Sequence, residues 1–151
     1  YSRFGFSDVL TMFLALNASV ELYKGGVVPL AEYAQRPYDR DILVRVLVPK
    51  ENARFVYQSV RNSQTDFPVL TCAAAKLADG SIRAAIGARP GKAVLYTAAP
   101  EAGETAEEFA ARFAAEVKAD IKTESNLRGG AEYRRHLAGV LTKRAVCRLE
   151  G

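Results

Sequence analysis

The spacing of hydrophobic residues changes about two thirds of the way along this chain, and this change most constrains its fold. Before Thr105, apolar residues alternate with other residues or form short runs between turns, which is typical of β-strands. After Thr105 they recur every three or four residues, as in amphipathic helices. Strands that come first and helices that come last predict an α+β fold, with a mostly antiparallel sheet covered by the C-terminal helices.

Residues 1–48 predict a small layer of helix and antiparallel strands. Ser7 is a candidate N-cap for the first helix, and Gly25 and Gly26 form a turn that tolerates positive φ. The predicted helices are 8–17 and 30–34, and the predicted strands are 19–24, 27–28 and 41–48. Alternation in the last strand predicts that its β-branched residues share one face, namely Ile42, Val44, Val46 and Val48.

Pro49–Asn52 is polar and begins with proline, so it is the predicted boundary between two subdomains, 1–48 and 49–151. Beyond it, three further strands are predicted at 55–61, 69–77 and 82–87. Asp79 and Gly80 lie between the last two apolar runs, and an Asp-Gly pair in this position predicts an antiparallel hairpin.

Two C-terminal helices are predicted, one from Ala106 through Val117 and one from Ala131 to about Arg148. Thr105 and Glu108 have the spacing of a capping box at the start of the first helix. Its inner face carries Phe109 and Phe113, whereas Glu107 and Arg112 fall on its outer face. The predicted inner face of the second helix consists of Tyr133, Leu137, Val140, Leu141 and Ala145.

Composition excludes several classes of protein. The 151 residues include two cysteines and one histidine, whereas a zinc or iron–sulfur site needs three or four such ligands, so a protein-only site of either kind is excluded. Both thiols are expected to be reduced, as in a cytoplasmic protein. No apolar run reaches the roughly 20 residues of a membrane span. The net charge of +4 is small and the basic residues are spread out, so no nucleic-acid footprint stands out.

Three features resemble functional motifs, and each has a simpler interpretation. Gly87–Ala93 resembles a phosphate-binding loop, but its glycines are too close and Ala93 replaces the hydroxyl residue that binds magnesium. His136 has no acid or cysteine at the spacing of a triad, so we expect a surface or half-buried histidine. Cys72 lies within an apolar strand, which favours a packed thiol over a nucleophile.

The last helix is basic and provides an alternative function. Its cations are Arg134, Arg135, Lys143, Arg144 and Arg148. They diverge around the helix and lack a set of aromatic residues on which bases stack, so a solvated charged face is the favoured interpretation. Weak nucleic-acid binding through this helix is retained as an alternative.

Four groups of segments, in order along the chain, resemble the flavoprotein (medium) subunit of molybdenum hydroxylases, the family of xanthine dehydrogenase and carbon monoxide dehydrogenase. They are Ser7–Leu10 with Leu14–Ala18; Val28–Tyr33 with Asp41–Leu43 and Val48–Pro49; Arg61 with Thr65–Pro68 and Ala73–Ala75; and Ile86–Pro90 with Arg128–Arg135 and Val140–Ala145. The resemblance covers essentially the whole chain.

The resemblance implies an FAD-binding subunit of a xanthine dehydrogenase-like oxidoreductase. In that family, FAD receives electrons from a molybdenum centre through iron–sulfur clusters and passes them to an acceptor such as NAD. The implied partners are an iron–sulfur small subunit and a molybdopterin large subunit, with no nucleic acid and no membrane. The alternative is a non-catalytic interaction domain that has the same fold and binds no flavin.

The family's glycine-rich loops, which hold the flavin diphosphate, precede the segment that Ser7–Leu10 resembles. Residues 1–48 therefore resemble the rear part of the FAD-binding domain, and 49–151 resemble the C-terminal domain. Because the chain also begins at Tyr1 rather than Met, we expect a piece of a longer protein. By itself it is expected to be inactive and not to retain FAD.

Three residues are predicted to bind the cofactor through this resemblance. Asp8 matches an aspartate that contacts the sugar-phosphate portion of FAD, and Leu43 matches a strand residue that lies against the flavin. Gln58 stands where the family often has lysine, so a charge contact from this strand to the flavin is in doubt. Asp66 matches the acidic position of the following loop, where capping the next segment is an equally good interpretation. No catalytic and no metal-binding residue is predicted.

Overall fold

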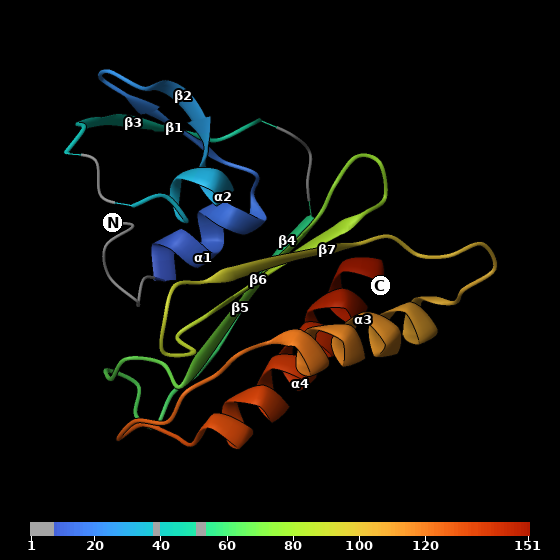
Figure 1. Cartoon of the computed structure of the whole chain (residues 1–151). Coiled ribbons are helices and arrows are strands. Elements are labelled where there is room, and N and C mark those ends of the chain that lie inside the picture. Colours follow the sequence, from blue (N-terminus) through green and yellow to red (C-terminus); the bar gives the residue numbers. More distant parts are fainter. Residues whose placement is uncertain (1–7, 38–39, 51–53) are drawn as a thin grey trace.

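The computed structural model describes residues 8–37, 40–50 and 54–151. It has two antiparallel sheets and four helices in these ranges, arranged as Figure 1 shows. The N-terminal elements are α1 (Asp8–Ala15), β1 (Ser19–Leu22), β2 (Gly26–Pro29), α2 (Leu30–Tyr33) and β3 (Leu43–Leu47). The rest are β4 (Arg54–Val60), β5 (Leu70–Lys76), β6 (Ile82–Gly87), β7 (Val94–Ala98), α3 (Ala106–Asp120) and α4 (Ala131–Glu150). The predicted α+β class is confirmed.

The N-terminal elements form at the predicted places. The first helix ends at Ala15, two residues earlier than predicted, and Asn17 adopts a φ of 55°, a left-handed conformation that asparagine tolerates. The three strands pair in the order β2-β1-β3. Ser7, the predicted N-cap, lies outside the described residues.

The predicted face of β3 is wrong. Its register against β1 shifts, so that Val46 pairs with Val20 and Leu43 pairs with Leu22. A shift of this kind places an extra residue in one strand and reverses the alternation of side chains beyond it. Consequently Leu43 and Val46 are half-buried, whereas Ile42 and Val44 are exposed.

The four-stranded sheet has the order β4-β5-β6-β7, and every pair is antiparallel. Its last strand, β7, was not predicted, because its apolar residues follow the loop at 87–93 with no clear alternation. β5 is buried along almost its whole length, which explains why it reads as a continuous apolar run.

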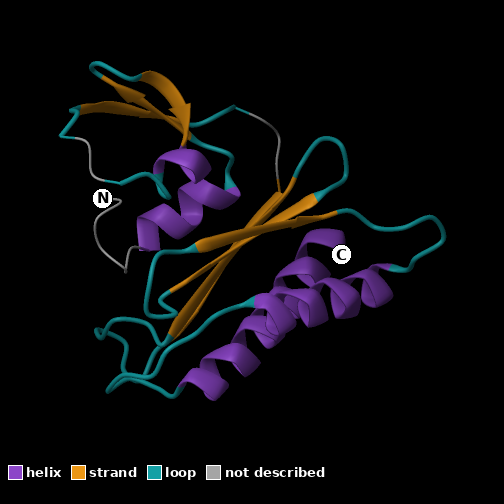
Figure 2. Cartoon of the chain, viewed as in Figure 1, coloured by secondary structure: helices purple, strands orange, loops and turns teal. Residues whose placement is uncertain are grey.

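Both faces of this sheet are covered. Cys72 and Ala74 of β5 belong to a core that they share with α3 and α4. Ala73 of β5 and Ala85 of β6 belong to a second core with α1 and the small sheet. Figure 2 shows α1 and the C-terminal helices on opposite sides of the strands. The C-terminal helices therefore cover one face, as predicted, and α1 covers the other, across the predicted boundary at Pro49–Asn52. Glu51 and Asn52 of that boundary lie outside the described residues.

The approach of α1 to the sheet is close because the facing residues are small. A Cβ atom added to Gly87 would lie 2.3 Å from Thr11 Oγ1 of α1 and 2.6 Å from Thr71 Oγ1 of β5. The two hydroxyl oxygens are themselves 3.4 Å apart. Gly87 is therefore needed at a contact between α1 and β6, a role that its place in a candidate phosphate loop did not suggest.

The predicted start and inner face of α3 are confirmed. Thr105 and Glu108 form the capping box, with Thr105 Oγ1 accepting from the Glu108 amide at 3.3 Å. Phe109 and Phe113 are buried, and their rings stack with centroids 6.0 Å apart. α4 lies directly against β4 and β5, whereas α3 lies beside α4. Tyr96 of β7 donates to Asp120 of α3 at 3.0 Å, which ties α3 to the far edge of the sheet.

Arg112, predicted on the outer face of α3, connects three groups. Its guanidinium donates to Glu104 at 2.9 Å, to Glu116 at 2.9 Å and to the carbonyl of Ala99 at 2.9 Å. The hydrogen bond from Arg112 is the main reason that the pKa of Glu104 falls to about 2.

The inner face of α4 is partly confirmed. Leu137, Leu141 and Ala145 are buried, and Val140 is half-buried. Tyr133 is exposed, and the neighbouring Arg134 takes the buried position instead. The reason is tertiary: the loop before α4 folds back and offers several carbonyl oxygens to the guanidinium, and the single O–H of a tyrosine could not donate to all of them.

Within the described ranges, no helix is long and apolar enough to span a membrane. No group of three or more histidine, cysteine or acidic residues could hold a metal ion in the same part of the chain.

We expect Phe109→Ala to lower the free energy of unfolding by about 3–5 kcal/mol, because it leaves a cavity in the core between the helices and the sheet. Glu107→Ala is the control, since the Glu107 side chain is 86% exposed, and it should stay within about 0.5 kcal/mol. Urea unfolding curves measure both. Equal midpoints for the two variants would show that α3 does not bury this face.

We expect Gly87→Ala to destabilise the chain by about 1–3 kcal/mol, because its methyl group would overlap two hydroxyl groups in a packed contact. Gly130→Ala is the matched control, since Gly130 has an ordinary φ of −78° and nothing within 4 Å of an added Cβ. The same unfolding measurement applies. A Gly87→Ala variant no less stable than the control would contradict the close contact of α1.

Candidate functional site

Asp8, the first described residue of α1, is held by two side chains from the four-stranded sheet and its following loop. Tyr57 Oη of β4 donates to Asp8 Oδ1 at 2.8 Å, and Arg61 Nη2 donates to Asp8 Oδ2 at 3.1 Å. The side chains of Asp8 and Arg61 are 30% and 28% exposed, so the ion pair is half-buried. Both carboxylate oxygens of Asp8 are therefore engaged, and the group still reaches solvent.

The alternation of β4 explains why these donors meet Asp8. Tyr57, Ser59 and Arg61 are two residues apart and so lie on the same side of the strand. Arg61 Nε donates to Ser59 Oγ at 3.3 Å and Arg61 Nη1 donates to the carbonyl of Asp66 at 2.6 Å, which fixes the guanidinium. Burial, helped by the hydrogen bond to Asp8, raises the pKa of Tyr57 to about 12. Its hydroxyl thus remains a donor at any physiological pH.

The predicted site residue Gln58 does not join this group. Consecutive residues of a strand point to opposite faces, so Gln58 lies on the side of α4, where its Nε2 is 3.5 Å from the carbonyl oxygen of Leu141. Tyr57 and not Gln58 therefore lies beside Asp8, and a cofactor contact from Gln58 stays a prediction. The period of the strand is the signal that identifies Tyr57, since Tyr57 shares the face of Arg61.

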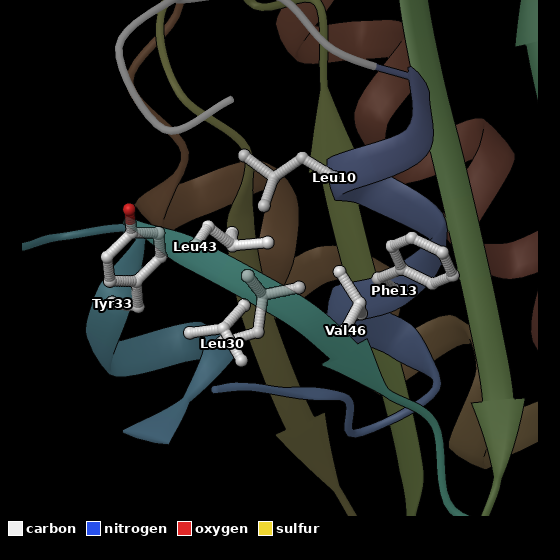
Figure 3. Close-up of a pocket in the computed structure, with 7 residues that line it drawn as sticks. Leu10, Phe13, Leu30, Tyr33, Leu43 and Val46 are labelled. Atoms are coloured by element: carbon white, nitrogen blue, oxygen red, sulfur yellow. The ribbon is translucent and has the colours of Figure 1, made fainter. Parts of the chain in front are cut away.

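Leu43 belongs to the same layer as Asp8 but faces a different environment. It lines a small apolar cavity with residues of α1, α2, β1 and β3, namely Leu10, Phe13, Val20, Leu30, Tyr33 and Val46. Figure 3 shows this cavity. This cavity has room for about one water molecule, which is too little for an aromatic ring system. A flavin therefore does not fit inside it, and a contact with Leu43 has to use the exposed part of this half-buried side chain.

Asp66 has the capping role that was one of its two interpretations. Its Oδ1 accepts from the amide of Phe67 at 2.7 Å and from Arg128 Nε at 3.1 Å. The hydrogen bond from Arg128 is the main reason that the pKa of Asp66 is lowered. The Arg128 guanidinium also lies over the Phe67 ring, 5.2 Å from its centroid. Asp66 thus joins the loop after β4 to the loop before α4.

The first cation of the basic last helix, Arg134, points into the protein interior and not to solvent. Arg134 is fully buried, and its guanidinium donates to three backbone carbonyls and one side-chain amide: Val69 at 2.9 Å, Glu124 at 2.6 Å, Gly129 at 2.5 Å and Asn126 Oδ1 at 2.6 Å. Arg134 cannot contact a phosphate in this position. This side chain secures the loop before α4, and nothing in its sequence spacing distinguishes it from the exposed Arg135.

The other candidate motifs lie where their simpler interpretations place them. Arg89 donates to the carbonyls of Lys92 and Lys122, both at 2.7 Å, and its guanidinium packs on Gly91, so this loop presents no empty phosphate cradle. His136 is exposed. Cys72 is buried, and burial raises the pKa of its thiol to about 12, which makes it a poor nucleophile.

These residues fit only part of an FAD molecule. A carboxylate accepts hydrogen bonds and repels phosphate, so Asp8 fits the hydroxyl groups of the polyol rather than the diphosphate. Leu43 fits an apolar surface. Within the described ranges, glycines are adjacent only at 25–26 and 129–130, and neither pair has the spacing of a phosphate-binding loop. The group at Asp8, Tyr57 and Arg61 is thus a candidate for part of a cofactor site.

Comparisons with known proteins identify the family of the chain. A family model described as CO dehydrogenase flavoprotein C-terminal domain matches residues 55–149. No curated protein sequence matches the chain.

Several solved structures have the same fold. Quinoline 2-oxidoreductase from Pseudomonas putida 86 is 18% identical, with a TM-score of 0.74 over 95% of this chain and 56% of that one. Carbon monoxide dehydrogenase from Hydrogenophaga pseudoflava, in a form that lacks the Mo-pyranopterin moiety of the molybdenum cofactor, is 22% identical, with a TM-score of 0.77 over 95% and 56%. Reconstituted CO dehydrogenase from Oligotropha carboxidovorans is 20% identical, with a TM-score of 0.78 over 99% and 59%.

The chain spans somewhat more than half the length of these solved chains, and at these identities the likeness establishes the fold. The family model goes further, because it covers most of the sequence. The chain belongs to the CO dehydrogenase flavoprotein C-terminal domain family, as its resemblance to the FAD-binding subunits of molybdenum hydroxylases predicts.

Proposed function

We propose that this chain is part of the FAD-binding subunit of a molybdenum hydroxylase-type, xanthine dehydrogenase-like oxidoreductase. In this proposal the subunit relays electrons from iron–sulfur clusters through FAD to an acceptor such as NAD. The observation that carries it is the carboxylate of Asp8, held by Tyr57 and Arg61 at 2.8 and 3.1 Å, next to the domain that the family model matches.

Each residue of the site has a limited task in this proposal. Asp8 accepts a hydrogen bond from a hydroxyl group of the cofactor's polyol, and the exposed part of Leu43 packs against an apolar surface of the flavin. When bound, FAD supplies hydride and electron transfer, which no side chain provides. The diphosphate is held by glycine-rich loops outside this sequence.

The partners follow from the same proposal. An iron–sulfur small subunit delivers electrons, and a molybdopterin large subunit chooses the substrate. The complex is cytoplasmic in this proposal, consistent with the reduced, unpaired thiols of Cys72 and Cys147. The nucleic-acid alternative is weakened, because the buried Arg134 leaves the basic face of α4 with fewer cations.

We expect the chain of 151 residues to be purified without colour and to bind no FAD on gel filtration. The physical reason is that the diphosphate carries most of the charge of FAD, and the described residues offer it no nest of backbone amides. The flavin absorbance of the protein peak measures this. A flavin band that co-elutes with the chain after FAD is added would contradict the expectation that FAD binding needs glycine-rich loops outside these 151 residues.

We expect Asp8→Ala to weaken FAD binding by about 1–3 kcal/mol in the full-length subunit, because a cofactor hydroxyl loses its acceptor in a half-buried site. Asp120→Ala is the matched control, since Asp120 also accepts a tyrosine hydroxyl, at 3.0 Å, on the opposite side of the sheet. Equilibrium titration by flavin fluorescence measures both variants. Unchanged FAD affinity for Asp8→Ala would show that Asp8 does not contact the cofactor and only joins α1 to β4.

A further inference from the structure

The carboxylate of Asp8 would not hold one orientation without its two donors. An aspartate in the first turn of a helix is attracted by the free amides of that turn, and its side chain can rotate to reach them. Here Tyr57 Oη and Arg61 Nη2 each bind a different carboxylate oxygen, at 2.8 and 3.1 Å. Two donors on two oxygens determine both the position and the rotation of the group.

We infer that Tyr57 is a positioning residue of the proposed cofactor site: with Arg61, it fixes the carboxylate of Asp8 to accept a hydroxyl group of the cofactor. This inference rests on the proposed function and adds a residue that the family resemblance does not assign. Gln58, the neighbouring residue of the strand, has its side chain on the opposite face against α4.

Tyr57 is suited to this task by its surroundings. Its ring packs against the core shared by α1 and the small sheet, so the hydroxyl is delivered by a rigid, half-buried side chain. Arg61 is equally constrained, because its other nitrogens donate to Ser59 Oγ at 3.3 Å and to the carbonyl of Asp66 at 2.6 Å. Both donors are therefore preorganised before any cofactor binds.

The chain contains its own control for this arrangement. Tyr96 of β7 donates to Asp120 Oδ2 of α3 at 3.0 Å, so a second tyrosine joins a strand to a helical aspartate. Tyr96 is half-buried like Tyr57, but it packs against the other core, on the side of α3 and α4. Tyr96→Phe removes the same hydrogen bond without touching the proposed site.

The experiment measures FAD affinity and stability together in the full-length subunit. Wild type, Tyr57→Phe, Tyr96→Phe, Asp8→Ala and the double variant Asp8→Ala with Tyr57→Phe are titrated with FAD, and their apo forms are unfolded in urea. We expect Tyr57→Phe to weaken FAD binding about tenfold, as for loss of one hydrogen bond to a charged group, and Tyr96→Phe to stay within about twofold. In the Asp8→Ala background, Tyr57→Phe should cause no further loss, because it acts through Asp8.

The outcomes separate this inference from the function on which it rests. If wild type binds no FAD, the proposed function fails and the inference fails with it. If Asp8→Ala weakens binding but Tyr57→Phe does not, the proposed function stands and the inference is overturned. It is also overturned if Tyr57→Phe and Tyr96→Phe lower FAD affinity equally, since that would show a general loss of stability rather than a role at Asp8.

Discussion

The four-stranded sheet is buried on both faces, and the small side chains on one of them determine how the rest of the chain is arranged. Ala73 and Ala85 have no exposed area, and Gly87 has no room for a Cβ atom beside α1. A helix can therefore lie directly on the strands, where larger residues would hold it away. This close contact places Asp8, the first described residue of α1, within hydrogen-bonding distance of β4.

Most of the fold could be predicted because its signals are local. The capping box of Thr105 and Glu108 and the apolar period of α3 depend on residues a few positions apart, and both predictions are confirmed. The strands at 55–61, 69–77 and 82–87 were found for the same reason, although a continuous apolar run such as β5 does not tell which residue faces which layer. Cys72 and Ala74 of β5 therefore belong to one core, and Ala73 of the same strand belongs to the other.

The features that were missed depend on tertiary contacts and not on local spacing. Arg134 is buried because carbonyls of the loop before α4 and of Val69 accept its hydrogen bonds. No spacing in the sequence predicts these acceptors. β3 turns Leu43 inward through a shift of register against β1. Tyr57 was within reach of prediction, since it precedes Arg61 by an even number of residues, but its partner Asp8 is 49 positions away. Pairings of this length come from the fold and not from local preference.

The two tyrosine–aspartate pairs of this chain share the same hydrogen bond but differ in what surrounds it. Tyr96 and Asp120 have the same chemistry as Tyr57 and Asp8, with donor distances of 3.0 and 2.8 Å. The pair of Tyr57 and Asp8 differs in having a cation beside it. Arg61 binds the other oxygen of Asp8 and is itself held by the loop after β4. A half-buried anion that is balanced by a fixed cation can keep its charge and still accept a further hydrogen bond. In the function proposed above, this third group distinguishes a pair that also binds a ligand hydroxyl from a pair that only joins a helix to a strand.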